Sequence, residues 1–538
     1  MKIRLPDYIS VYAEDFRRDF PVCGKIIEFD DVKITLDLGD TLMLKIKADT
    51  LKPAYIRLRY NFTEEEKRCE PVKILRDDYE RGYGTMAWKG IEPEIMFPWY
   101  MLVSNGSDMN PDTRLRHTEG FGVRVQPNSI VTWQYDGKGV SLWADIRCGG
   151  QGVDLSGREL DVCEVIFSDY NGISAFDAGR NFCALMCPNP KLPDHKVYGS
   201  NNWYYAYGDS SHEQIIEDTK IVAERCAGLE NRPYMVIDDC WQKNRCDGPW
   251  DQLRDTFRDM KELAKEMSDL GVRPGIWLRY LSDQHYELPF GDECRMVHNK
   301  GMLDPSHPDV IEYIIKTTRM IREWGFCLIK HDFSTFDMFG DFLRNYTDKI
   351  TRNGWHFYDT HRTSAEIVKA MYRAVREGAG DDCVIIGCNT IPHFCAGIYE
   401  LNRTGDDTSG ENWELTRKDG VNTLAMRQIH NGTFYMADAD CVGITELVPW
   451  EMNRKWLDVL ARSGSPLFVS CKPGVLNEEQ LCELKAAWAV NSVQENECRP
   501  LDWMENLVPA YWMIDGEMVE YDWYTEYGNE LFSRWTVN

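Results

Sequence analysis

The sequence has little of what nucleic-acid-binding and membrane proteins need. Its 538 residues include 61 Lys or Arg against 87 Asp or Glu, a net charge of −26, so no basic surface for nucleic acid or an anionic membrane is expected. No window approaches the ~20 apolar residues of a membrane span. The start, Met1-Lys-Ile-Arg-Leu-Pro, lacks the apolar stretch of a signal peptide. We therefore expect a cytoplasmic protein that binds neither nucleic acid nor a membrane.

The 18 cysteines show no metal-binding or disulfide pattern. None occurs in a CxxC pair, and several lie inside apolar runs, among them Cys327, Cys383, Cys388 and Cys441. This distribution predicts buried, reduced thiols rather than a zinc site or a disulfide framework. The sequence implies no cofactor.

The chain is too long for one hydrophobic core, so two or three domains are expected. Residues 1–190 contain strand-like segments separated by Asn-Gly, Asp-Gly and Gly-Gly turns, which predicts an N-terminal antiparallel β-sandwich. Residues 33–47 alternate apolar and polar side chains around Gly39-Asp40, as in a hairpin. A helix is predicted over 173–186, before a Pro-rich linker at 187–194. Further strands are predicted at 54–62, 97–104, 120–125, 130–135, 140–146 and 162–167.

Residues 191–490 change to a repeated strand, loop and helix pattern. Eight apolar runs with helical stretches between them predict a central (β/α)8 TIM barrel. The fifth unit leaves little room for a helix between Cys388 and Tyr399. Residues 491–538, rich in Trp and Tyr, are predicted to form a small C-terminal β region packed against the barrel. The eight runs are 202–206, 234–237, 274–278, 327–329, 384–387, 399–403, 433–437 and 466–469.

Carboxylates cluster just after the predicted barrel strands. A single Asp there is usually a helix cap or a turn residue, an interpretation that is strongest for Asp407 and Asp438. Here, however, seven Asp residues lie at four strand ends, together with Lys330 and Arg403. Because the C-terminal strand ends of a barrel meet at one face, this cluster indicates an active site. Two facing carboxylates are the minimum for cleaving a glycosidic bond. The seven are Asp238, Asp239, Asp332, Asp406, Asp407, Asp438 and Asp440.

These strand ends resemble those of clan D α-galactosidases, glycoside hydrolase families 36 and 27. The N-terminal β region is similar to that of family 36, whereas Asp-Asp-Cys-Trp and Ser-Pro-Leu-Phe are closer to family 27. The resemblance implies a retaining α-galactosidase that acts on a neutral α-galactoside oligosaccharide or glycoconjugate, needs no cofactor, and has relatives that often form homo-oligomers. The matching segments are Asp238-Asp239-Cys240-Trp241, Lys330-His331-Asp332, the segment from Arg403 to Asp406, Asp438-Ala439-Asp440 and Ser465-Pro-Leu-Phe-Val-Ser.

The catalytic roles follow from the resemblance. Asp332 matches the nucleophile, which would form a glycosyl-enzyme, and a second carboxyl would act as acid and then base. Asp406 is favoured for that role as the first Asp after a small residue, as in family 36. Counting from Arg403, as in family 27, favours Asp407, and this alternative stays open. Lys330 lies on the same side of its strand as Asp332 and is expected to keep it ionised.

The resemblance also assigns substrate-binding residues. Asp238 and Asp239 would accept hydrogen bonds from the sugar hydroxyls O4 and O6. Arg403 would contact O2 or orient the acid/base, Cys388 would line the pocket, and Asp440 would contact O2 or support the residues that do.

Three further expectations concern the walls of the pocket. Trp203 and Trp241 are candidates for stacking on the sugar, although a core position is equally compatible with each. Asn389 stands where typical family 27 α-galactosidases carry a Glu that touches the group at C2, which leaves galactose specificity open. An N-terminal loop enters the pocket in family 36, and residues 97–100 and 114–119 are the candidates here.

Several other functions remain compatible with the sequence. An α-N-acetylgalactosaminidase, a β-L-arabinopyranosidase and an α-galactosyl transferase belong to the same class. A non-catalytic sugar-binding barrel is a different class, and the presence of both catalytic carboxylates argues against it. A metal-dependent enzyme is disfavoured because Lys330 and Arg403 would repel the ion. Its ligands would be Asp238, Asp239, Asp438 and Asp440.

Overall fold

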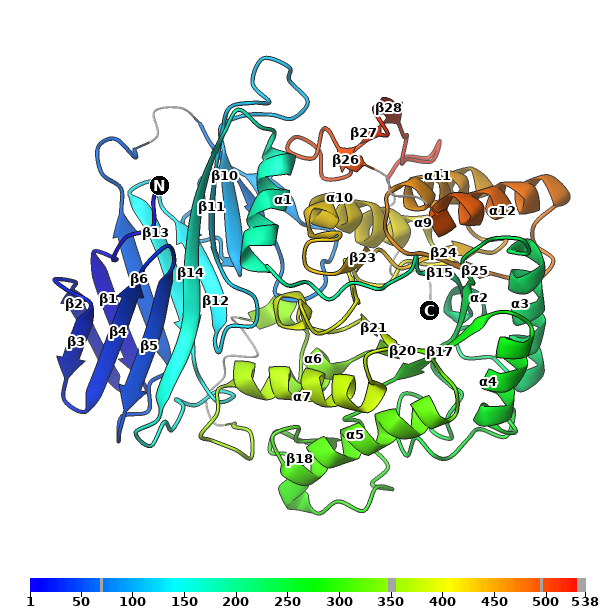
Figure 1. The fold of residues 1–538 in the computed structure, drawn as a ribbon, viewed down its shortest axis with the longest axis horizontal. Helices are drawn as coiled ribbons and strands as arrows, with labels where there is room; N and C mark the ends of the chain where they lie inside the picture. Colours follow the sequence, from blue (N-terminus) through cyan, green and yellow to red (C-terminus); the bar gives the residue numbers. More distant parts are fainter. Residues whose placement is uncertain (68–70, 347–354, 494–496, 530–538) are drawn as a thin grey trace.

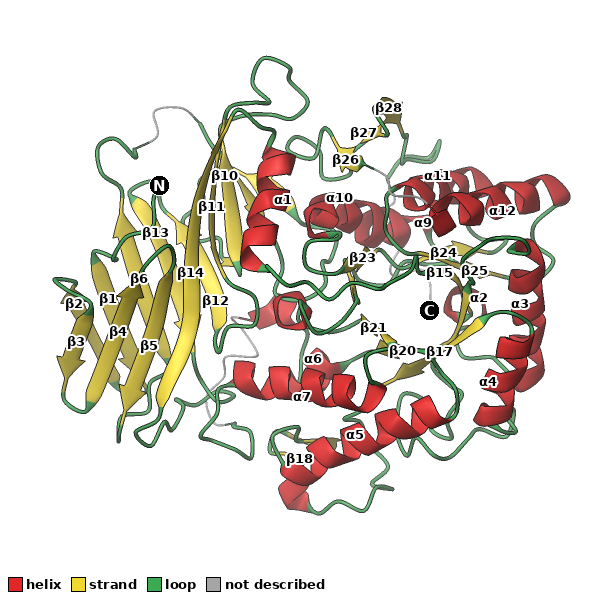
Figure 2. Ribbon diagram, in the orientation of Figure 1, coloured by secondary structure: helices red, strands yellow, loops and turns green. Residues whose placement is uncertain are grey.

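The computed structural model describes residues 1–67, 71–346, 355–493 and 497–529. Two antiparallel sheets at the N-terminus lie beside a curled parallel sheet with helices around it, and a small sheet at the C-terminal end lies near the helices of the barrel (Figures 1 and 2). The predicted multidomain architecture is therefore confirmed. Its boundaries at 190 and 490 remain predictions, and residues 494–496 and 530–538 of the expected C-terminal region lie outside the described residues. No described helix combines the length and apolarity needed to cross a bilayer.

The N-terminal sandwich consists of a six-stranded and an eight-stranded sheet. The hairpin predicted around Gly39-Asp40 is present, with alternate side chains buried in both of its strands. Trp133 and Phe167 join the sheets through rings 5.9 Å apart. The first sheet runs β2 (Phe16–Pro21), β1 (Tyr8–Ala13), β6 (Tyr55–Asn61), β13 (Gly139–Asp145), β12 (Ile130–Tyr135), β9 (Phe97–Pro98). The second runs β3 (Ile26–Phe29), β4 (Val32–Leu38), β5 (Leu42–Ala48), β14 (Glu159–Asn171), β11 (His117–Val123), β10 (Tyr100–Ser104), β7 (Lys73–Arg76), β8 (Ala87–Lys89).

The barrel sheet is parallel, and the strands at the two ends of its pairing order are connected directly by the chain. Its two ends in the pairing order are consecutive in sequence and separated only by Ala439 and Asp440, whose φ of 69° breaks the seventh predicted strand into two. The order is β23 (Met436–Asp438), β22 (Leu401–Arg403), β21 (Val384–Gly387), β20 (Leu328–His331), β17 (Arg273–Leu278), β16 (Tyr234–Ile237), β15 (Tyr198–Asn201), β25 (Leu467–Cys471), β24 (Cys441–Ile444).

The first barrel strand differs from the prediction. Residues 202–206 were expected to be a strand, but the strand is β15 and the short helix α2 (Trp203–Ala206) follows it. The side chain of Asn201 accepts a hydrogen bond from the Trp203 N–H at 2.8 Å, and this turn ends the strand. Trp203 therefore lies at the C-terminal face of the barrel.

Helices cover the outside of the barrel (Figure 2). The fifth unit has only α8 (Pro392–Cys395), as the short spacing predicts. After β22, a π-helical stretch, Thr416–Asn422, lies between α9 (Trp413–Leu415) and α10 (Thr423–Arg427). The longer covering helices are α3 (His212–Arg225), α4 (Met260–Asp269), α5 (Pro308–Glu323), α7 (Ser364–Ala379), α11 (Trp450–Arg462) and α12 (Glu478–Val493). Outside the barrel sheet lie α1 (Ala175–Met186), β26 (Cys498–Pro500), β27 (Tyr511–Ile514) and β28 (Glu517–Glu520).

A loop of the N-terminal region, residues 77–86 between β7 and β8, crosses to the barrel; we call it the bridging loop. Arg427 fixes it, because its buried guanidinium lies 2.8 Å from Asp77 and donates to the Thr404 carbonyl at 2.9 Å. Gly82 donates its N–H to Thr404 and accepts from the Asp406 N–H, both at 2.8 Å. The bridging loop is thereby hydrogen-bonded to the segment that follows β22.

Replacing Arg427 by Ala should destabilise the protein strongly. The change leaves the buried Asp77 carboxylate without its partner, and breaking a buried ion pair typically costs about 3–5 kcal/mol. Urea unfolding measures the loss. The exposed pair of Arg258 and Glu213, 2.6 Å apart, supplies the control, because Arg258→Ala should change the midpoint little. Equal midpoints for the two variants would show that Arg427 does not fix the loop.

Candidate active site

Asp332 follows β20 and is held at both carboxylate oxygens. The Trp277 indole donates to Oδ2 at 3.0 Å, and the N–H of Phe333 donates to Oδ1 at 2.7 Å. Phe333 has a φ of 59°, a conformation uncommon for a bulky residue, at the point where its N–H bonds the Asp332 side chain. Burial disfavours the ionised carboxylate, but the charges of Arg81 and Lys330 with these two donors outweigh it, so the pKa of Asp332 lies below its ordinary value.

Lys330 lies two residues before Asp332 and makes its own ion pair. Its ammonium is 2.7 Å from Asp238 Oδ2, which also accepts from the Asn201 amide at 2.7 Å. Lys330 is thus fixed by Asp238, and its charge still lowers the pKa of Asp332. Both members of the pair are buried in the barrel mouth.

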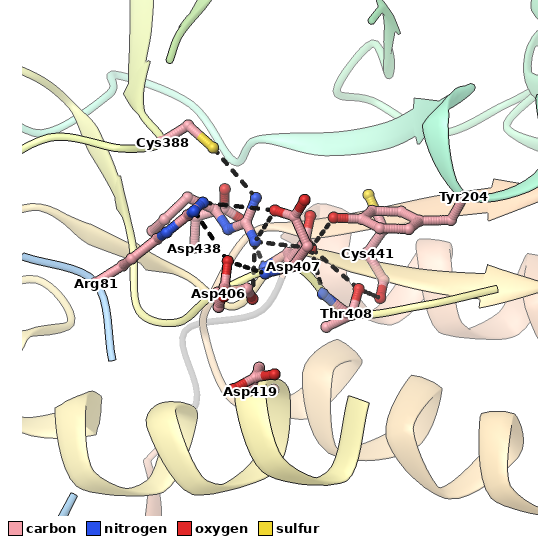
Figure 3. Close-up of polar contacts among 12 residues, drawn as sticks. Arg81, Tyr204, Cys388, Asp406, Asp407, Thr408, Asp419, Asp438 and Cys441 are labelled. Carbon is pink, nitrogen blue, oxygen red and sulfur yellow. Dashed lines mark hydrogen bonds and ion pairs between the residues drawn. The ribbon is translucent and has the colours of Figure 1, made fainter. Parts of the chain in front are cut away.

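Arg81, from the bridging loop, pairs with the two acidic residues after β22. Its guanidinium lies 2.9 Å from Asp406 Oδ1 and 3.6 Å from Asp407 Oδ1. Figure 3 shows Arg81 on one side of Asp406 and Asp407, and Tyr204 on the other. One N-terminal cation therefore acts on both candidate acid/base residues and on Asp332.

Arg403 and Asp440 form a second buried ion pair beneath Asp407. Arg403 is 2.8 Å from Asp440 Oδ2 and 3.4 Å from Asp407 Oδ1, and it donates to the Cys388 sulfur at 3.4 Å. Asp440 also accepts from the Tyr204 hydroxyl and from the N–H and hydroxyl of Thr408. All of these contacts fall on Oδ2, so this oxygen of Asp440 supports Arg403 and the segment after β22.

Asp406 and Asp407 differ in how firmly they are held. Asp406 is tied by Arg81 and by the N–H of Asp407, which donates to its Oδ1 at 3.0 Å. The Asp406 side chain is 26% exposed and that of Asp407 is 51% exposed. Desolvation by the surrounding walls nevertheless raises the pKa of Asp407 to about 6, assisted by Asp406 and Asp440 and opposed by Arg403 and Arg81. Asp407 is therefore the freer carboxyl, and it is protonated in mildly acidic solution.

The other expected sugar contacts fall into two groups. Asp239 is buried and already accepts from Gln242 at 2.6 Å and from the N–H and thiol of Cys246 at 3.0 and 2.7 Å, so it mainly holds its own loop. Trp241 is fully buried and donates its indole N–H to the Trp277 carbonyl at 3.0 Å, which leaves no face for a sugar. Trp203 is half-buried at the mouth and stays a candidate platform.

Asn389 is fully buried and bonded to the bridging loop. Its amide donates to Glu80 Oε2 at 2.8 Å, and its Oδ1 accepts from the Phe336 N–H at 3.2 Å. Burial raises the pKa of Glu80 to about 7, against the opposing effects of Arg81, Tyr83 and Asn389. The position assigned to the C2 group therefore presents a barrel amide already paired with an N-terminal carboxyl.

Three residues near the candidate catalytic pair, Glu80, Arg81 and Trp277, were not predicted from the sequence. Trp277 lies inside the third strand, one residue before its end, where the rule for polar residues after a strand does not mark it. Glu80 and Arg81 lie between two strands of the N-terminal sheet, where no local pattern marks them. The N-terminal segments proposed instead were wrong: Trp99 and Tyr100 are buried against His393 and His430, and 114–119 lies beside the buried chain start at Met1.

Metal binding finds no support at the barrel mouth. The described residues contain two groups of potential ligands at suitable spacing, and neither includes a strand-end carboxylate. Asp238 and Asp440 are paired with Lys330 and Arg403 instead. Within the described residues the cysteines are unpaired in disulfides, and most of them are buried, whereas Cys23 and Cys482 are exposed.

Comparison with known proteins gives the fold. No family model matches the chain. The α-galactosidase of Thermus thermophilus, solved with p-nitrophenyl α-D-galactopyranoside, is 16% identical with a TM-score of 0.60 over 93% of this chain and 99% of its own. A family 36 α-galactosidase of Geobacillus stearothermophilus is 13% identical, with a TM-score of 0.58 over 90% of this chain and 71% of its own. The chain has the fold of clan D glycoside hydrolases.

A third similar structure widens this group. The family 31 dextranase of Flavobacterium johnsoniae, solved with glucose, is 10% identical, with a TM-score of 0.55 over 96% of this chain and 68% of its own. The clan D fold is thus shared by enzymes named for different sugars, and at these identities the likeness establishes the fold alone.

Proposed function

We propose that the protein is a retaining glycoside hydrolase acting on terminal α-galactosides. The observation that carries the proposal is a difference in pKa between two carboxyl groups that both lie near Arg81. The pKa of Asp332 is lowered and that of Asp407 is raised. A retaining glycosidase needs one ionised nucleophile and one protonated acid in the same site. The α-galactoside substrate rests on the resemblance of the strand-end motifs and on the substrates named for the similar structures.

The mechanism has two displacements. An oxygen of Asp332 bonds to the anomeric carbon while the bond to the leaving oxygen breaks, and that oxygen takes the proton of Asp407. Asp407 then accepts a proton from water, whose oxygen attacks the anomeric carbon and releases Asp332. Each step inverts the configuration, so the sum is retention. We assign the acid/base to Asp407, reversing the preference for Asp406 drawn from the sequence, because Asp407 is exposed and protonated in mildly acidic solution.

Arg81 influences the protonation of both Asp332 and Asp407. Its charge favours both carboxylates in their ionised forms, and desolvation opposes that effect at Asp407. The N-terminal region thereby tunes the chemistry of the barrel.

The pH dependence of kcat/KM should be bell-shaped with its maximum in mildly acidic solution. Activity should fall above about pH 6, as Asp407 loses the proton it must donate, and again at low pH, where Asp332 becomes protonated. Arg81→Met removes a charge that favours the Asp407 carboxylate, so the basic limb should move to higher pH. A rate profile from pH 3 to 9 for both proteins measures this. An unmoved basic limb would contradict the role given to Arg81.

Azide should identify the two catalytic carboxyls by the product formed. In Asp332→Ala, azide can replace the nucleophile, and a single inversion gives a β-galactosyl azide. In Asp407→Ala, an activated nitrophenyl substrate needs no acid, so azide intercepts the glycosyl-enzyme and gives the α-azide after two inversions. Asp406→Ala should yield neither azide. An α-azide from Asp406→Ala, with none from Asp407→Ala, would return the acid/base role to Asp406.

A panel of nitrophenyl glycosides tests the substrate. The α-galactoside should be the best substrate, and Asp332→Ala should reduce its turnover at least ~10³-fold, since the covalent route is lost. Preference for the α-N-acetylgalactosaminide or the β-L-arabinopyranoside would replace the proposal by those activities. No turnover on any member, in a protein that binds galactose, would indicate a sugar-binding barrel. Activity should persist in EDTA.

A further inference from the structure

A cleft of about 790 Å³ lies on the catalytic face of the barrel, outside the site described above. Its walls come from the loop after β22, represented by Glu411, and from the loop after β24, represented by Leu447 and Pro449. Loops that follow barrel strands lie at the C-terminal face, where the catalytic carboxylates also are. The third wall is the segment after β28, with Tyr524 and Tyr527. We call this space the rim cleft.

The wall of the rim cleft begins at Glu411, in the same loop as Asp407. Asp407 and Glu411 lie in one loop, residues 404–412. In this loop the N–H of Gly410 donates to the Tyr207 hydroxyl at 3.2 Å. Tyr207 lies close enough to both Asp407 and Glu411 for their charges to raise its pKa, in addition to burial. Asp407 and Glu411, which lies on the wall of the rim cleft, therefore both lie close to Tyr207.

The chemistry of the first displacement fixes which part of a substrate lies on this side. The general acid stands beside the leaving oxygen, so the portion of the substrate beyond that oxygen extends from the acid, away from the nucleophile. The rim cleft is thus on the leaving-group side.

Its side chains suit a neutral, hydroxyl-rich chain. Tyr524 is 42% exposed and Tyr527 is 80% exposed, which provides apolar ring faces with polar edges. Within the described residues no ion pair engages Glu411, Asp522 or Glu526, so these carboxylates can accept hydrogen bonds from hydroxyls. Their negative charge disfavours acidic ligands.

The wall that carries these tyrosines is anchored rather than loose. The Trp413 indole donates to the Trp523 carbonyl at 2.9 Å, and Lys455 donates to the Asp522 carbonyl at 2.9 Å. Arg417 lies over the Tyr524 ring, 4.9 Å from its centroid, and is itself held by Glu414 at 2.7 Å. Tyr524 is therefore presented in a fixed orientation, which lowers the entropy lost on binding.

We propose that the rim cleft binds the leaving portion of an oligosaccharide substrate, two or more sugar units beyond the scissile bond, with Tyr524 and Tyr527 as its ring platforms. The proposal rests on the proposed glycosidase function and names its substrate class: oligosaccharides are preferred over galactosides with a short leaving group. The C-terminal region thereby takes part in substrate selection.

The ratio of kcat/KM for stachyose, with its three-sugar leaving group, to that for p-nitrophenyl α-galactoside tests the proposal. Tyr524→Ala and Tyr527→Ala should each lower the value for stachyose about tenfold and leave the nitrophenyl value unchanged, as expected for the loss of one aromatic contact. Tyr8→Ala, a tyrosine of the N-terminal sandwich that is 48% exposed, is the matched control and should alter neither. An unchanged ratio in both cleft variants would overturn the proposal.

A binding measurement separates this proposal from the proposed activity. In the full chain carrying Asp332→Ala, calorimetric titration should show stachyose binding more tightly than galactose, and adding Tyr524→Ala should remove the difference. Equal affinities for the two sugars before that second substitution would overturn the rim cleft even if the unmodified protein is an active galactosidase. Absence of turnover would instead count against the catalytic proposal, while the titration would still decide the cleft.

Discussion

The candidate site depends on one cation that does not belong to the barrel. Arg81 lies 2.9 Å from Asp406, interacts with Asp407 and Asp332, and is carried by a loop of the N-terminal sandwich. Without it the mouth would hold three neighbouring carboxylates with only Lys330 and Arg403 to balance them, and both of those are already paired. The two-sided architecture is therefore an electrostatic requirement of the site: the barrel supplies the acids, and the sandwich supplies a charge that favours the ionised forms of both Asp332 and Asp407, while desolvation raises the pKa of Asp407.

The position of Arg81 depends in turn on backbone contacts that only small residues permit. Gly82 and Gly405 bridge the two regions, and a Cβ on Gly405 would come within 1.9 Å of the Asp419 carbonyl. Asp419 lies in the π-helical stretch after α9, where the widened turn faces this contact. Close packing at the bridge lets hydrogen bonds, rather than long side chains, fix the distance between the domains.

Much of the fold could be predicted because its signals are local. The apolar runs predict most of the barrel strands, the first one excepted, and the strand-end rule predicts that Asp238, Lys330 and Asp332 lie together. Long-range contacts could not be predicted in this way. Arg81 has no sequence pattern that connects it with Asp406, and Trp241 and Trp203 differ in burial although both follow barrel strands. The choice between Asp406 and Asp407 depended on which carboxyl Arg81 holds, and adjacent identical residues carry no such information.

Phe333, the left-handed residue after the proposed nucleophile Asp332, links the stability of the protein to its activity. Phe333, with a φ of 59°, holds a conformation that costs a bulky residue roughly 1–3 kcal/mol and persists only because the surroundings enforce it. Arg279 lies over its ring, 4.5 Å from the centroid, and is clamped by the buried Asp337 at 2.7 Å. The strand end thus stores conformational energy next to Asp332, the proposed nucleophile. Substitutions that relax this backbone would raise the free energy of unfolding but orient the Asp332 carboxylate less well. At the mouth of the barrel, gains in stability and gains in rate therefore oppose each other.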